Sequence, residues 1–189
     1  TRLIGTCAGH GDNIGIYAMR GGSITRITDD GNKKSEARFS PDGKWISYIE
    51  EDAATSRSNL CLVPSSGGKP VRLSDSSGFL NDVKIHCWSG ARSICYLDFI
   101  TLVVTSLDGV VLNKIDLSGL TNFKALMADS RNPDRIYLVA RESSGDLTFS
   151  IFAVSKREGG YRAIKQKRAF WEMNHTISPS FIACGHRFS

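Results

Sequence analysis

The sequence lacks most of the local motifs that mark an enzyme or a membrane protein. Its 189 residues contain no Gly-x-Ser-x-Gly elbow and no Gly-x-x-x-x-Gly-Lys-Ser/Thr loop, and no dinucleotide-binding fingerprint follows a predicted strand. Its apolar runs fall far short of the roughly 20 residues that span a bilayer. The start, TRLIGTCAGH, has neither the basic nor the apolar region of a signal peptide, although a first residue Thr1 leaves open a removed leader. We therefore expect no serine hydrolysis, no nucleotide cradle and no membrane insertion.

Cysteine and charge are also limited. The five cysteines, Cys7, Cys61, Cys87, Cys95 and Cys184, include no Cys-x-x-Cys spacing, so we expect buried free thiols rather than a zinc site. With 41% hydrophobic and 23% charged residues, the chain is long enough for one globular core. The net charge of +5 is mild, and the basic stretch 165–168 comes without a nucleic-acid-binding motif. This stretch is therefore predicted to be a solvated edge, and no nucleic-acid partner is expected.

The clearest local signal is the stretch ARFSPDGKWISYIE, residues 37–50. Pro41 presets φ for a turn, Ser40 and Asp42 can bond to the nearby backbone, and Gly43 can adopt the left-handed conformation. The run WISYI that follows is nearly continuously apolar, which is typical of a strand covered on both faces. The stretch therefore predicts a hairpin that needs further sheets around it.

A longer repeat decides the predicted architecture. NIGIYAMRGGSITRITDD from Asn13 aligns without a gap on NLCLVPSSGGKPVRLSDS from Asn59, at an offset of 46 residues. Weaker copies begin at Leu102 and Phe149, and the hairpin of residues 37–50 also recurs in less regular form. One unit is thus four strands in roughly 42 to 50 residues, which is the length of a β-propeller blade.

The pattern of Ser-Pro-Asp-Gly, apolar strands, Gly-Gly and then Arg-Leu-Ser or Ile-Thr resembles the TolB-like β-propeller repeat. Related repeats occur in the propellers of prolyl-oligopeptidase relatives and of oligogalacturonate lyases. The resemblance implies an all-β fold with about four blades of four antiparallel strands, either as a small ring or as a segment of a larger propeller. The expected divisions are a partial blade at 1–30, blades at 31–76, 77–118 and 119–167, and a closing or partial blade at 168–189.

Two histidines are the leading candidates for a site. The repeat alignment places His86 and His175 at the position of Ala37, near the start of the innermost strand and beside a central funnel. Oligogalacturonate lyases hold a divalent metal with histidines in such a funnel, so the resemblance implies that His86 and His175 are metal ligands. The alternative is a histidine packed singly between blades or bonded to a loop carbonyl. Trp171 and Arg38 complete the predicted ligand-binding residues.

The predicted function follows from this resemblance. We expect a TolB-like scaffold or binding module without catalysis or a cofactor of its own. Its partner would be a protein, bound on the funnel face or through incomplete terminal blades that could also pair two copies. The alternatives are a metal-assisted polysaccharide lyase-like enzyme that binds an oligosaccharide, and the regulatory propeller portion of a peptidase. The resemblance implies a periplasmic or cell-envelope location, whereas the residues themselves leave the compartment unknown.

A basic residue recurs on the predicted outermost strands, at Arg26, Arg72 and Lys114. Repeated cations at such positions could bind an acidic partner. Charged residues on edge strands also prevent one sheet from pairing with another, and we favour this second role.

Overall fold

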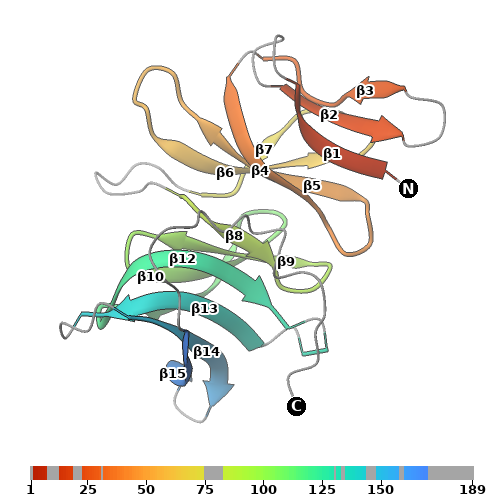
Figure 1. Cartoon of the computed structure of the whole chain (residues 1–189). Helices are drawn as coiled ribbons and strands as arrows, with labels where there is room; N and C mark the ends of the chain where they lie inside the picture. Colours follow the sequence, from red (N-terminus) through yellow and green to blue (C-terminus); the bar gives the residue numbers. More distant parts are fainter. Residues whose placement is uncertain are drawn as a thin grey trace.

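The computed structural model describes residues 2–7, 13–18, 23–30, 32–74, 83–129, 131–132, 135–143, 148–157 and 160–169. All regular structure within these ranges is β-strand, arranged in one three-stranded and three four-stranded antiparallel sheets. Consecutive strands of the sequence are neighbours in each sheet (Figure 1). The predicted all-β class with four-stranded antiparallel sheets is thus confirmed. These ranges hold no helix that is long and apolar enough to cross a membrane.

The first two sheets lie in the upper half of Figure 1 and the last two in the lower half. The first sheet contains β1 (Arg2–Cys7), β2 (Asn13–Ala18) and β3 (Ile24–Arg26). The second contains β4 (Lys33–Phe39), β5 (Trp45–Glu51), β6 (Ser58–Pro64) and β7 (Val71–Arg72). The third contains β8 (His86–Trp88), β9 (Ser93–Asp98), β10 (Thr101–Ser106) and β11 (Val111–Asp116). The fourth contains β12 (Leu120–Ala128), β13 (Arg135–Glu142), β14 (Phe149–Arg157) and β15 (Gly160–Ala169).

The Ser-Pro-Asp-Gly turn joins β4 to β5 as predicted. Gly43 has a φ of 71°, and its N–H donates to the carbonyl of Ser40 at 2.9 Å. The Ser40 hydroxyl donates to Asp42 at 2.6 Å and accepts the N–H of Trp45 at 3.0 Å. The hydrogen bond from Ser40 holds the pKa of the Asp42 carboxyl below its usual value. The turn sequence therefore closes the hairpin through side-chain as well as backbone bonds.

The sequence repeat corresponds to a repeated hydrogen bond. The hydroxyl of Thr28 accepts the N–H of Ile14, and the hydroxyl of Ser74 accepts the N–H of Leu60, both at 2.9 Å. Each hydroxyl follows the outermost strand and caps the start of the strand beside it. This bond explains why Ile-Thr-Asp and Leu-Ser-Asp recur at the same place in the two units.

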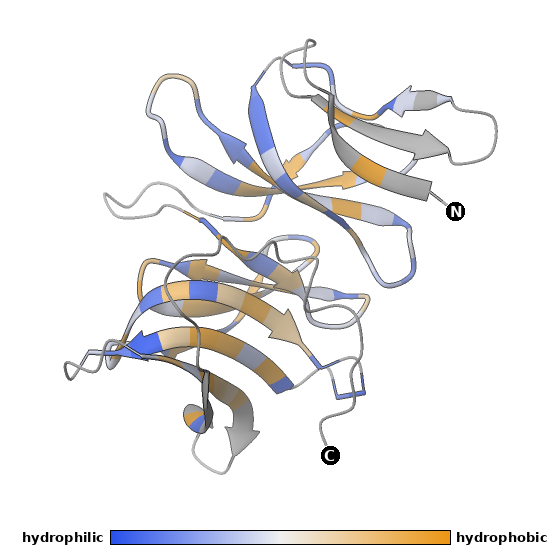
Figure 2. Ribbon diagram, viewed as in Figure 1, coloured by the Kyte–Doolittle hydropathy of each residue, from blue (hydrophilic) through white to orange (hydrophobic). Residues whose placement is uncertain are grey.

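Three buried clusters join neighbouring sheets. One lies between the first two sheets around Ile14 and Tyr48, one between the second and third around Leu62 and Ile94, and one between the last two around Leu138. Strand β5 contributes to two of them, because successive side chains of a strand point to opposite faces. Figure 2 shows the same hydrophobic character along β13. The continuous apolar runs are thus strands that are buried on both faces.

Three of the cysteines are buried free thiols, namely Cys61, Cys87 and Cys95, in agreement with the prediction for them. Burial raises the pKa of the Cys61 thiol to about 12. The side chains of Cys7 and Cys184 lie outside the described residues. The described cysteines are therefore part of the packing between sheets.

A strained turn joins β9 to β10. Asp98 pairs with Thr101, so the turn consists of Phe99 and Ile100, and Phe99 is exposed with a φ of 52°. A bulky side chain in the left-handed region costs roughly 1 to 2 kcal/mol, whereas asparagine tolerates this conformation.

Phe99→Asn is expected to raise the free energy of unfolding by about 0.5 to 1 kcal/mol, because it relieves this strain at an exposed position. Urea denaturation measures the change. Ile100→Asn is the matched control, because Ile100 is not among the described residues with a positive φ. Equal effects of the two substitutions would contradict the strain.

Candidate binding site on the first strands

His86 begins β8 and is buried at the junction of the second and third sheets. Its Nε2 lies 2.8 Å from the Oγ of Ser47 on β5, and this Oγ lies 3.4 Å from the carbonyl oxygen of Arg38. When the Ser47 hydroxyl donates to that carbonyl, its oxygen accepts the N–H of Nε2, which favours the Nε2–H tautomer. Among the described residues Nδ1 of His86 has no hydrogen-bond partner. The imidazole therefore holds one buried acceptor lone pair.

The surroundings of His86 keep it neutral. Burial lowers its pKa to about 3, and the positive charge of Arg38 acts in the same direction. Removal from water and a nearby cation both disfavour the imidazolium form. At neutral pH the ring is thus in the form that can accept a hydrogen bond or bind a metal ion.

Arg38 lies on β4 next to a β-bulge. The pairing of β4 with β5 shifts between Ser35 and Arg38, and Glu36 within the shift has a φ of 53°. Arg38 donates from Nη2 to Oε2 of Glu36 at 2.8 Å, and the two side chains are 32% and 34% exposed. Bulges often redirect side chains beside functional sites. This one presents a half-exposed ion pair.

Strand β12 carries a corresponding irregularity. Its pairing with β13 shifts between Thr121 and Ala125, and Asn122 has a φ of 53°. Glu36 and Asn122 both directly follow the last paired residue before the shift, on the first strand of their sheets. Asparagine tolerates this conformation, whereas a glutamate held in it costs of order 1 to 3 kcal/mol, and such strained residues cluster at functional sites. The first strands are therefore the best candidates for a binding surface.

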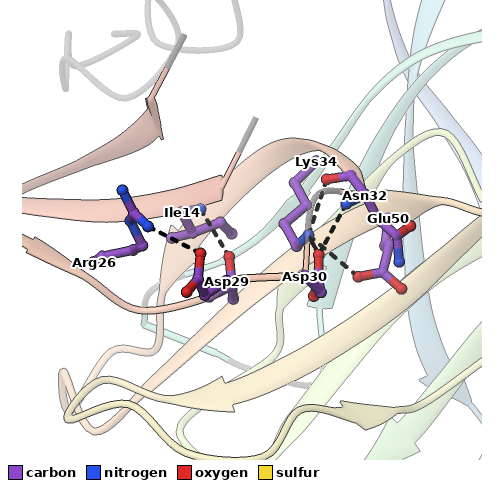
Figure 3. A network of polar contacts seen from close by, with 8 residues as sticks. Ile14, Arg26, Asp29, Asp30, Asn32, Lys34 and Glu50 are labelled. Carbon is purple, nitrogen blue, oxygen red and sulfur yellow. Dashed lines mark hydrogen bonds and ion pairs between the residues drawn. The ribbon is translucent and has the colours of Figure 1, made fainter. Parts of the chain in front are cut away.

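A second polar group, which we call the Lys34 cluster, consists of Asp30, Asn32, Lys34 and Glu50 (Figure 3). The side chain of Lys34 is 0% exposed, and its Nζ forms an ion pair with Asp30. Nζ also lies 3.5 Å from Oε2 of Glu50 and donates to the carbonyl of Asn32 at 2.9 Å. Asp30 follows the first sheet, whereas Lys34 and Glu50 belong to the second, so one ammonium group fastens the two sheets together. Sequence reasoning missed this cluster.

The structure brings together two of the four predicted site residues. Arg38 is close enough to His86 to influence its pKa. His175 and Trp171 lie outside the described residues. Within the described ranges no group of three or more His, Cys, Asp or Glu residues could hold a metal ion. The metal hypothesis, which also requires His175, stays a prediction.

No protein-family model matches this sequence, and no curated protein matches it either. Solved structures give the informative comparison. TolB from Acinetobacter baumannii is 15% identical with a TM-score of 0.58, over 82% of this chain and 38% of that one. The β-propeller domain of the Trilobed protease from Pyrococcus furiosus is 14% identical with a TM-score of 0.59, over 88% of this chain and 54% of that one. The fold is a β-propeller.

A further propeller match comes from a nidogen–laminin complex, at 13% identity and a TM-score of 0.60, over 88% of this chain and 61% of that one. The chain spans between 38% and 61% of the lengths of these structures. At such low identity the likeness shows the fold alone. The four sheets are thus blades, and blades of a propeller surround a central channel. The Glu36–Arg38 pair lies on β4, which is the first strand of its sheet and one of its two edges.

Proposed function

We propose that this chain is a binding module of the TolB-like β-propeller type, which recognises a protein partner and has no catalytic activity of its own. The observation that carries this proposal is the strained bulge of β4, which presents the Glu36–Arg38 ion pair on the first strand of its sheet. A half-exposed carboxylate and guanidinium offer acceptors and donors for peptide groups and side chains. Support for the TolB-like type comes from the Ser-Pro-Asp-Gly turn and the structural similarity to TolB.

A protein partner also agrees with one of the comparisons. One of the similar structures is a nidogen–laminin complex, in which two proteins are assembled. In this chain Arg38 is the natural anchor, because arginine is enriched among the residues that dominate binding energy at interfaces. Its neutral neighbour His86 adds no second positive charge to the site.

The proposal is tested with a partner isolated from the source cells by cross-linking to the full chain, and then purified. Isothermal titration calorimetry should give saturable one-to-one binding, and Arg38→Ala should weaken it about tenfold, which corresponds to about 1.4 kcal/mol. Lys44→Ala is the control, because the Lys44 side chain is 78% exposed and lies in the turn before β5. If Arg38→Ala and Lys44→Ala bound the partner equally well, the partner would bind at a surface other than β4. Metal-dependent cleavage of a polysaccharide by the purified chain would favour the lyase-like alternative instead.

The similarity to a protease propeller supports a second candidate, the regulatory propeller portion of a peptidase. This candidate predicts that the complete gene also encodes an α/β-hydrolase segment with a Gly-x-Ser-x-Gly elbow. Sequencing the complete gene decides between a peptidase subunit and an independent module.

A further inference from the structure

The outermost strands carry one exposed basic residue per blade at a shared position. Each of these residues lies opposite the corresponding residue of the adjacent strand, which is β2, β6, β10 or β14. The pairs are Arg26 with Gly15, Arg72 with Cys61, Lys114 with Val103, and Lys165 with Phe152. The structure thus extends the three-residue ladder of the sequence to a fourth blade. Among the side chains that the structure describes on these four strands, only those of β11 combine the cation with a run of exposed apolar residues.

Strand β11 has an open backbone edge at Lys114. The N–H of Leu117 donates to the carbonyl of Ile100 at 2.8 Å, which fixes the alternation of bonded and non-bonded pairs between β10 and β11. By this alternation Lys114 and Asp116 direct their backbone N–H and C=O groups away from β10. Sheet order places β11 at the edge, with β10 as its only strand neighbour in the described chain. An extended segment could therefore bond to this edge without displacing a native strand.

Apolar side chains continue this edge. Val110, Val111 and Leu112 are 56%, 46% and 57% exposed. They account for three of the five large hydrophobic residues that are exposed in the described ranges, and they are consecutive. An exposed apolar stretch on an edge strand is unfavourable unless a partner covers it. Outer strand β7, by comparison, has only two residues.

The charge of Lys114 distinguishes β11 from two of the other three strands. Arg26 pairs with Asp29 at 2.9 Å and Lys165 pairs with Glu142 at 2.7 Å, so two cations of the ladder have a carboxylate of their own. Lys114 makes no ion pair within the described ranges. The nearby carboxylate of Asp116 instead accepts the N–H and the hydroxyl of Ser118, at 2.9 and 3.0 Å. Lys114 is thus available to a carboxylate from another molecule.

We propose that the edge of β11 is a docking site for an extended segment of a protein partner, which adds as a fifth strand and places an acidic side chain opposite Lys114. Apolar residues of that segment would cover Val110, Val111 and Leu112. A protein partner is a better occupant than a second copy, because the only acid that β11 of a second copy offers, Asp116, is already bound to Ser118. This proposal deepens the proposed function and rests on it. The mode of recognition is strand addition, in which backbone bonds supply affinity and side chains supply selectivity.

The probe is a fluorescent nine-residue peptide in which Val and Thr alternate around a central Glu, compared with peptides that carry Gln or Lys there. Fluorescence polarisation should show that the full chain binds the Glu peptide about threefold more tightly than the Gln peptide. Lys114→Glu should reverse the preference, so that the Lys peptide binds best. Arg72→Glu is the matched control, because Arg72 occupies the same position on β7 without the apolar stretch, and it should change nothing.

Lys114→Pro tests the backbone part of the proposal. Proline is tolerated on an edge strand where the N–H faces outward, so the chain should stay folded while peptide binding is lost. Unchanged peptide binding by Lys114→Pro would overturn the proposal. So would a loss of Glu-peptide binding in Arg72→Glu as large as that in Lys114→Glu. A dimer of the chain alone that Lys114→Pro dissociates would also overturn it, since a second copy would then be the occupant.

The cross-linked partner separates this proposal from the proposed function. Partner binding that is weakened by Arg38→Ala but unaffected by Lys114→Glu would overturn the β11 site and leave the proposed function standing. Glu-peptide binding that responds to Lys114, in a chain for which cross-linking finds no partner, would support the docking edge and count against the proposed function.

Discussion

Lys34→Met is expected to lower the free energy of unfolding by about 3 kcal/mol. The substitution keeps most of the aliphatic stem and removes the ammonium group that is 0% exposed between Asp30 and Glu50. Loss of one partner from a buried ion pair costs roughly 3 to 5 kcal/mol, because the remaining charge stays out of water. The expected value lies at the lower end, since Asp30 is 38% exposed and can regain water, whereas Glu50 at 12% cannot.

The neighbouring lysine provides the control for this experiment. Lys33 also pairs with a carboxylate, Glu51 at 3.0 Å, but its side chain is 66% exposed. Surface ion pairs contribute about 0 to 1 kcal/mol, so Lys33→Met should have a small effect in the same urea titration. Adding Glu50→Gln to Lys34→Met should restore part of the stability, because it removes the uncompensated charge. If Lys33→Met and Lys34→Met were equally destabilising, the buried ion pair would contribute no more to the free energy of unfolding than the exposed one.

The contrast between these two lysines shows where sequence reasoning ends. Lys33 and Lys34 are chemically identical and adjacent, and only strand alternation combined with the position of the first sheet decides which is buried. The partners of Lys34 come from two different sheets, and their convergence depends on packing between blades. No local pattern in the sequence predicts this convergence.

The hairpins and their repeat, by contrast, were predictable because their causes are local. Gly43 and Ser40 impose the turn before β5 through their own backbone and side-chain preferences. The 46-residue offset from Asn13 to Asn59 reflects one hydrogen bond pattern made twice. Repetition of this kind identifies the unit, and the unit identifies the fold.

The candidate site falls between these two cases. Alignment of the repeats placed His86 on a first strand, where the structure has it, but the hydroxyl that it contacts belongs to Ser47, which is 39 residues away. The bulges at Glu36 and Asn122 were also beyond prediction, because glutamate rarely adopts a positive φ without an environment that enforces it. Asparagine does so more readily than glutamate, but a single Asn in a strand is a weak signal.

The second prediction with a large expected effect concerns the stability of the fold at acid pH. His86 has a folded pKa of about 3, and an unfolded histidine titrates near 6.5. Between these values the unfolded chain binds a proton that the folded chain does not, so the free energy of unfolding rises with pH. The contribution of His86 is fully present above pH 6.5 and is lost progressively as the pH falls toward 3. Between pH 7 and pH 5 this loss amounts to about 2 kcal/mol.

His86→Gln isolates this contribution, because the glutamine amide can still donate to Ser47 but does not titrate. Urea denaturation of both proteins at pH 7, 6 and 5 gives the difference in their free energies of unfolding, and other titrating groups cancel in that difference. As the pH is lowered from 7 to 5, the free energy of unfolding of the wild type should fall by about 2 kcal/mol relative to that of His86→Gln. A constant difference would mean that water reaches the ring in the folded state. The seam between the second and third blades would then be open, and His86 would be free to meet a ligand.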